Sequence, residues 1–135
     1  MTNCSFRTGD VIYADFPNGI GSQQKGKRYA VIISNNVGNS MSSTVQVLPA
    51  TTKRNNSYLP THAHFNAGEC SLPQDTVFLA EQAVTINKFQ IIRVLDKMTE
   101  SQLKRIAKAL LCAIPMTVTA VPETINTPQF ERLRV

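Results

Sequence analysis

Short hydrophobic segments separated by polar turns run along most of the chain. Residues 11–16 (VIYADF) alternate enough to predict a strand, and residues 29–34 (YAVIIS) form a continuous β-branched run, typical of a central strand buried on both faces. Further strands are predicted at residues 44–50, 61–66, 76–81 and 90–95, with a polar connection at 35–43. Pro49 indicates an edge position or a bulge. Because no helix is expected between these strands, they favour an antiparallel, strongly bent sheet or small barrel.

One amphipathic helix is predicted near the C-terminus. Thr99 and Gln102 form a capping box, and Pro115 stops the helix. An apolar stripe at helical spacing is expected to pack on the sheet; it comprises Leu103, Ile106, Ala107, Leu110, Leu111 and Ile114. The fold class is therefore mainly β with a C-terminal helix (α+β). Residues 1–115 are expected to form one domain, and 116–135 a C-terminal extension that is disordered or adds an edge segment.

Charge and cysteine content narrow the function. The 135 residues carry a formal net charge of +5, and five of the six basic residues before position 60 fall in two loops, Lys25, Lys27 and Arg28 in one and Lys53 and Arg54 in the other. Such a patch suits an anionic partner, although basic loops are often merely solvated. Three widely spaced cysteines predict neither a disulfide framework nor a zinc site, and indicate a reduced, cytoplasmic protein. No apolar run or signal peptide indicates a membrane role.

Common catalytic signatures are missing from the sequence. It contains no GxSxG, HExxH, P-loop or GxGxxG motif. His62 and His64 are two residues apart in a predicted strand, so they should face the same side and offer a metal-ligand or acid/base pair. The alternative is a pair of exposed histidines without a ligand, because two ligands do not make a metal site. We therefore expect no metal and no cofactor.

A stronger candidate site combines Arg28 with Thr51 and Thr52. Each lies where a predicted strand meets a loop, and a guanidinium with a hydroxyl suits a phosphate if the two strands are neighbours. The lysines of the two loops, Lys25, Lys27 and Lys53, would extend this positive field along a polyanion.

Five sequence blocks resemble, in order and spacing, the MazF/PemK (Kid) family of type II toxin endoribonucleases. They are residues 9–16 (GDVIYADF), 21–28 (GSQQKGKR), 31–39 (VIISNNVGN), 59–62 (LPTH) and 75–82 (DTVFLAEQ). The resemblance covers roughly residues 8–114. It implies an SH3-like small barrel of the plasmid-maintenance-toxin (CcdB/Kid/MazF) type, a homodimer, an acidic antitoxin partner, and metal-independent, sequence-specific cleavage of single-stranded RNA.

The same resemblance implies particular site residues. The family's catalytic arginine falls on Arg28 and its threonine on Thr51. RNA-contacting positions fall on Ser22, Gln23, Gln24, Leu59, Thr61, Glu81 and Gln82. To these we add the lysines of the basic loops, Lys25, Lys27 and Lys53, and the neighbouring hydroxyl of Thr52. For proton transfer from the ribose 2′-OH the sequence offers His62, His64 and Glu81, because arginine stays protonated.

Two departures and two alternatives accompany the resemblance. Tyr29 follows Arg28 where the family usually has proline, and Gln23 stands where it often has glutamate. The missing proline frees a backbone N–H, and the missing carboxylate changes the preference for bases. The alternative functions are a CcdB-like gyrase inhibitor on the same fold and a non-catalytic RNA-binding barrel.

Overall fold

The computed structural model describes residues 5–19, 26–52 and 59–115. Seven strands lie in these ranges: β1 (Asp10–Phe16), β2 (Gly26–Ile32), β3 (Thr44–Thr51), β4 (His62–Phe65), β5 (Thr76–Leu79), β6 (Val84–Asn87) and β7 (Ile91–Lys97). Two α-helices, α1 (Asn36–Met41) and α2 (Glu100–Ala113), and three short 3₁₀ segments, η1 (Glu69–Ser71), η2 (Ala80–Gln82) and η3 (Lys88–Gln90), complete the described part.

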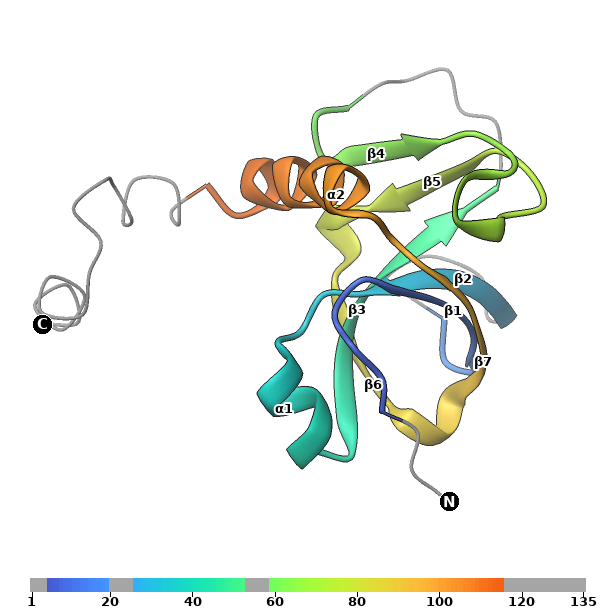
Figure 1. Cartoon of the computed structure of the whole chain (residues 1–135), viewed down its shortest axis with the longest axis vertical. Helices are drawn as coiled ribbons and strands as arrows, with labels where there is room; N and C mark the ends of the chain where they lie inside the picture. Colours follow the sequence, from blue (N-terminus) through green and yellow to red (C-terminus); the bar gives the residue numbers. More distant parts are fainter. Residues whose placement is uncertain (1–4, 20–25, 53–58, 116–135) are drawn as a thin grey trace, which may run out of the picture.

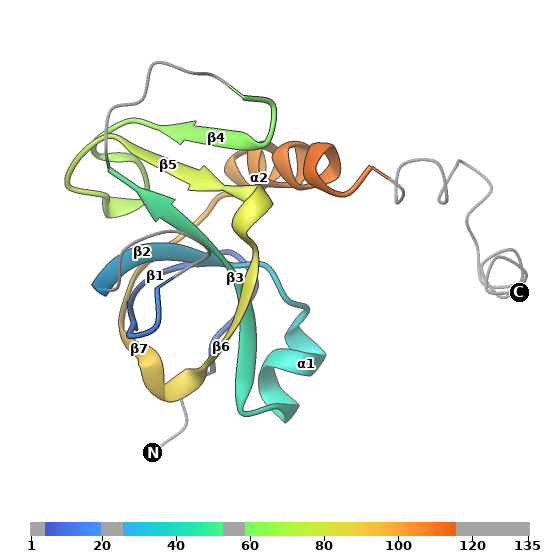
Figure 2. The same ribbon diagram turned by 180° about the vertical axis from the view of Figure 1, so that it is seen from behind.

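The strands form an antiparallel, strongly bent sheet in which β3 is central. The strand order is β4-β5-β3-β2-β1-β7, and β6 pairs with β3 beside β5. Figure 1 shows β3 running from the part that contains β1, β2, β6 and β7 to the part that contains β4, β5 and α2. The same division is visible from behind in Figure 2. The mainly β fold with a C-terminal helix is thus confirmed.

Hydrophobic residues of the sheet contribute to two separate buried clusters. One lies within the curved part of the sheet and includes Ile12, Ala30, Ile32, Val47 and Ile86. The other lies between the sheet and α2 and includes Val31, Phe65, Phe78, Ile106 and Ala109. Because neighbouring residues of β2 enter different clusters, the prediction that this strand is buried on both faces is confirmed.

The helix α2 begins and ends as its sequence predicts. The Thr99 side chain accepts a hydrogen bond from the Gln102 backbone N–H, and the Gln102 side chain accepts one from the Thr99 N–H. Ile106 and Ala109 are its buried residues, while Ala107, Leu111 and Ile114 of the predicted stripe are exposed. The apolar stripe is therefore narrower than predicted. Among the described residues, no helix is long and apolar enough to cross a membrane.

The polar connection at residues 35–43 contains a helix that was not predicted. The Asn35 side chain caps α1 by accepting a hydrogen bond of 2.8 Å from the Gly38 N–H. Asn39 is 1% exposed, and its amide donates to the Ser34 carbonyl at 2.9 Å. These asparagines stabilise a helix that has no hydrophobic periodicity of its own.

Several predicted strand boundaries are wrong, and Pro49 does not mark an edge strand. Pro49 lies in the central strand β3 opposite Ala30 of β2. On its other side β3 pairs with β6 up to Val47 and with β5 from Ala50, so Pro49 occupies the gap where a missing N–H costs no ladder bond. Glu81 lies in η2 rather than in a strand, and β6 was not predicted.

Candidate active site

Antiparallel pairing of β2 with β3 brings the predicted catalytic residues to the same place. The observed register runs from the Ile32–Val47 pair to the Ala30–Pro49 pair; continued by two residues, it would set Arg28 opposite Thr51, the last residue of β3. Gly26 begins β2 with a φ of 135°, a conformation that glycine adopts far more readily than other residues. The glycine therefore lets the chain enter β2 two residues before Arg28.

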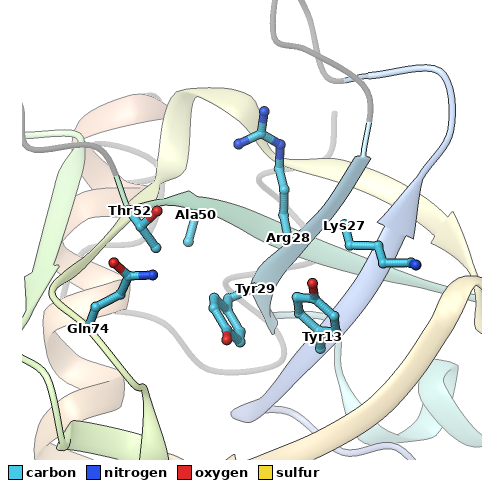
Figure 3. Close-up of a pocket in the computed structure, with 7 residues that line it drawn as sticks. All are labelled: Tyr13, Lys27, Arg28, Tyr29, Ala50, Thr52 and Gln74. Carbon is cyan, nitrogen blue, oxygen red and sulfur yellow. The ribbon is translucent and has the colours of Figure 1, made fainter.

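Arg28 lines a pocket of about 230 Å³ at the junction of β2 and β3. The pocket is bordered by Tyr13, Lys27, Arg28, Tyr29, Ala50, Thr52 and Gln74 (Figure 3). The Nε atom of Arg28 is buried, so this part of the guanidinium is shielded from solvent. Lys27 and Thr52 are exposed at the pocket. The positive charge and hydroxyl groups suit an anionic oxygen ligand such as a phosphate.

A second polar cluster surrounds Glu81 at the junction of β4 and η2. His62 Nε2 lies 3.1 Å from Glu81 Oε2, and the Thr61 side chain also hydrogen-bonds to the carboxylate. Burial alone would raise the pKa of Glu81, but hydrogen bonds from its own backbone N–H, from Thr61 and from His62 outweigh burial and lower it. Glu81 is therefore held as a carboxylate that fixes the His62 ring.

His62 and His64 face the same side of β4, as predicted. Their ring centroids are 6.4 Å apart, and they line a pocket of about 290 Å³ together with Pro60, Ala63, Arg105, Lys108 and Ala109. Burial, with a smaller contribution from His62, lowers the pKa of His64. This pocket shares no lining residue with the Arg28 pocket, so the two sites are distinct in the described part of the chain. Nor do three or more acidic, histidine or cysteine residues gather there as a metal-binding group.

The comparisons with known proteins identify the family. The family model described as "PemK-like, MazF-like toxin of type II toxin-antitoxin system" matches residues 7–114. The chain is also 36% identical over 104 residues to the endoribonuclease MazF of Staphylococcus saprophyticus subsp. saprophyticus, covering 77% of this chain and 87% of that protein. The chain belongs to the PemK/MazF toxin family. The predicted family, toxin class and endoribonuclease class are thereby confirmed.

Solved structures of the PemK/MazF family share the fold. MazF (form I) from Deinococcus radiodurans superposes with a TM-score of 0.70 at 20% identity, covering 84% of this chain and 100% of that chain. An endoribonuclease in complex with its cognate antitoxin, from a mycobacterial species, gives a TM-score of 0.67 at 22% identity, covering 84% and 97%. At this level of identity, the structural similarity supports the fold, a small toxin barrel.

The structure gathers some of the toxin's predicted site residues and leaves others apart. Arg28, Lys27 and Thr52 line one pocket, with Thr51 at the adjoining end of β3, whereas Thr61, His62 and Glu81 cluster elsewhere. Leu59 is 49% exposed, and Gln82 is half-buried with its Oε1 atom inaccessible. Ser22, Gln23, Gln24, Lys25 and Lys53, together with the predicted extension 116–135, lie outside the described residues.

Sequence reasoning missed three side chains next to the predicted residues. Tyr13 and Gln74 line the Arg28 pocket, and Arg105 lines the histidine pocket. The alternation in residues 11–16 predicts that Tyr13 and Ile12 point to opposite faces of the sheet. This local signal could have indicated that Tyr13 does not pack beside Ile12. Gln74 and Arg105 join these pockets only through the packing of loops and α2, which leaves no local sequence signal.

Proposed function

We propose that this chain is the toxin of a type II toxin–antitoxin system and cleaves single-stranded RNA at the Arg28 pocket. The observation that carries the proposal is the β2–β3 pairing, which ends at Ala30 and Pro49 and directs Arg28 and Thr51, two residues further on, towards an open pocket lined by Lys27 and Arg28. A guanidinium donates two parallel hydrogen bonds to phosphate oxygens, and the threonine hydroxyl adds a neutral donor. Both groups belong to hydrogen-bonded strands, so they are held rigidly.

The reaction that suits such a site uses the RNA's own nucleophile. The ribose 2′ oxygen attacks the adjacent phosphorus and loses its proton, while the bond from phosphorus to the 5′ oxygen breaks and that oxygen takes up a proton. The products are a 2′,3′-cyclic phosphate and a 5′-OH. Arg28 and Thr51 stabilise the negative charge that grows on the phosphate oxygens, and positioning of the internal nucleophile supplies much of the acceleration.

The partners of the toxin follow from the same chemistry. An acidic antitoxin segment that covers the cation Arg28 would exclude RNA from the pocket, because both ligands require the same positive charge. We place the action of the toxin in the cytoplasm, where RNA and antitoxin meet, and propose that it acts as a homodimer. We assign these functions to residues 1–115 and regard residues 116–135 as an extension of that toxin domain.

The first prediction tests the two donors. Purified protein should cut single-stranded RNA in EDTA, and Arg28→Ala and Thr51→Ala should each lower the rate by about 10²- to 10³-fold, the usual cost of removing one transition-state donor. Arg28→Lys should restore only part of the rate, since an ammonium lacks the planar fork. The matched control is Lys104→Ala, which removes a positive charge from the exposed face of α2. This variant should cut RNA at the wild-type rate.

Three results would contradict the proposal in different ways. Full activity of both Arg28→Ala and Thr51→Ala would show that Arg28 and Thr51 are not the catalytic residues. Salt-sensitive retention of intact RNA would favour a non-catalytic binding barrel. Gyrase binding without RNA cleavage would favour a CcdB-like inhibitor. Sequencing the 5′ ends of the cut RNA gives the cleavage motif in the same experiment.

A further inference from the structure

Tyr29 follows Arg28 in β2 and lies at one end of a row of three side chains, Tyr29, Tyr13 and Arg93, that crosses the sheet. It pairs directly with Tyr13 of β1, and the two ring centroids are 5.0 Å apart at an interplanar angle of 44°. On the other side of β1, Tyr13 pairs with Arg93 of β7, whose guanidinium carbon lies 5.0 Å from the Tyr13 ring centre. Tyr13 is therefore held between two neighbours, and Tyr29 is the member of the row nearest to Arg28 in the chain.

The opposite wall of the Arg28 pocket is polar. Figure 3 shows Gln74 and Thr52 on one side of the pocket and Tyr29 with Tyr13 on the other. The Thr76 hydroxyl, in a residue only 1% exposed, donates to the Gln74 backbone carbonyl at 2.8 Å and so fixes this turn. The Gln74 side chain is exposed, and its amide can both donate and accept hydrogen bonds.

The pocket has the size and chemistry for one flat, polar-edged group. Its volume of about 230 Å³ lies below the roughly 300–1,000 Å³ of typical small-molecule pockets, so it suits a single ring system rather than an extended ligand. Aromatic side chains bind unpaired bases of single-stranded RNA by stacking, and amides read the hydrogen-bonding edges of those bases. Arg28 lines the same pocket, and Figure 3 shows its guanidinium on the other side of β2 from the Tyr29 ring, so a phosphate at Arg28 and a base at Tyr29 would be neighbouring parts of one RNA strand.

We propose that the Tyr29–Gln74 pocket holds one nucleobase of the RNA, next to the phosphate bound by Arg28. The base packs against the Tyr29 ring, and its polar edge meets the Gln74 amide. This inference rests on the proposed function and makes Tyr29 and Gln74 determinants of RNA specificity. A proline at position 29 would offer no aromatic ring, so this toxin should differ in base preference from relatives that carry proline there.

The test measures coupling between Tyr29 and individual bases of the RNA. An oligonucleotide that contains the cleavage motif is blocked by a 2′-O-methyl group at the cut site, and variants lacking one base at a time are prepared. For the wild type, removing the stacked base should weaken binding by about 5- to 150-fold, the loss typical of one base–aromatic stack. Tyr29→Ala should bind the intact oligonucleotide more weakly by a similar factor, and should then be insensitive to removal of that one base.

Matched variants separate stacking from folding and from charge. Tyr29→Phe keeps the ring and should bind like the wild type. Gln74→Ala should relax the choice of base at the same nucleotide, and Lys27→Ala should weaken binding of all oligonucleotides equally, as loss of a phosphate contact does. Circular dichroism and thermal unfolding confirm that each variant is folded.

The outcomes distinguish this proposal from the proposed function. Equal binding by Tyr29→Ala and the wild type, or an equal additional loss at every abasic position in both proteins, overturns the base pocket even if RNA is cut. Absence of cutting by the wild type overturns the proposed function, while coupling at one position of any single-stranded oligonucleotide that the protein binds still establishes the base pocket. If the wild type and Tyr29→Ala bind antitoxin peptide equally, the result supports an RNA pocket. If Tyr29→Ala weakens binding of the antitoxin peptide but not of RNA, the result overturns it.

Discussion

At the scale of single residues, His62 and Arg28 occupy different surroundings although both are predicted site residues. The Nε2 atom of His62 lies 3.1 Å from the Glu81 carboxylate, and 7% of its side chain is exposed. Arg28 lines a separate pocket with tyrosines and threonine. A histidine held by a carboxylate resembles an acid/base pair, but a general base must reach the proton that it removes. Because the two pockets share no lining residue, we expect His62 to affect RNA binding rather than proton transfer at Arg28.

The second prediction concerns the kinetics of His62→Ala. We expect a larger rise in KM than fall in kcat, and an unchanged pH dependence of kcat, because His62 does not line the pocket of Arg28. Steady-state kinetics between about pH 5 and 9 measure both quantities. Glu81→Gln is the matched variant, since it retains a hydrogen-bonding side chain beside His62. Loss of a limb of the pH profile at about pH 6 to 7, where histidine side chains ordinarily titrate, would assign proton transfer to the imidazole instead.

At the scale of secondary structure elements, Arg105 of α2 contacts the outer edge of β4, the end strand of the sheet. Arg105 Nη1 donates to Glu69 Oε1 at 2.7 Å, Nη2 donates to the His64 backbone carbonyl, and the guanidinium carbon lies 4.0 Å from the Phe65 ring centre. The hydrogen bond from Arg105 is the main reason why the pKa of Glu69 is lowered. This clamp satisfies an exposed strand carbonyl and hinders pairing with another chain.

The third prediction concerns the pH dependence of this clamp. Because the folded-state pKa of Glu69 lies below 4.5, its contribution to stability is fully present above about pH 4.5 and is lost as the pH falls through the folded-state value. Glu69→Gln should lower the free energy of unfolding by about 0.5–1 kcal/mol at pH 7, allowing for the partly exposed pair, and by less at pH 3. Urea unfolding measures the difference, and Arg105→Lys should show a smaller loss at pH 7. An equal effect of Glu69→Gln at both pH values would contradict an ionic role.

At the scale of the whole molecule, the opposite edge of the sheet leaves apolar side chains uncovered. β7 pairs only with β1 in the described part of the chain, and its Ile92 and Val94 are 48% and 44% exposed. Shifts in pairing register along β1 and β7 add irregularity at this edge. Burial of such side chains against a second copy would stabilise the proposed homodimer.

The fourth prediction is that a charge on β7 weakens the dimer. Val94→Lys should shift the protein towards the monomer by sedimentation equilibrium, because an unpaired ammonium in an apolar interface is costly. Val37→Lys is the matched control, since Val37 is 74% exposed on α1, which lies between β2 and β3 in the sequence, far from β7. An unchanged association constant for Val94→Lys, with the fold intact, would place the dimer interface elsewhere.

The sequence by itself determined the features that depend on neighbouring residues. Alternation in residues 11–16 was enough for β1, and the Thr99–Gln102 pair was enough for the start of α2. The β-branched run at 29–34 indicated that a buried strand exists, but β2 begins at Gly26 and ends at Ile32, so Lys27 and Arg28 lie in the strand and not in the predicted loop. These signals are local, because side-chain periodicity and capping act within a few residues. The five ordered blocks were also enough to indicate the toxin family, which the comparisons confirm.

Only the tertiary structure decided how distant residues meet. The pairing of β2 with β3 brings Arg28 and Thr51 to adjoining strand ends, and three strands bring together the row of Tyr29, Tyr13 and Arg93. The tolerance of Pro49 in a central strand likewise depends on where β6 ends and β5 begins. No local pattern encodes these contacts, since they arise from strand pairing and from the packing of two cores. The sequence therefore identified Arg28 as the candidate cation, and the fold supplied the pocket around it.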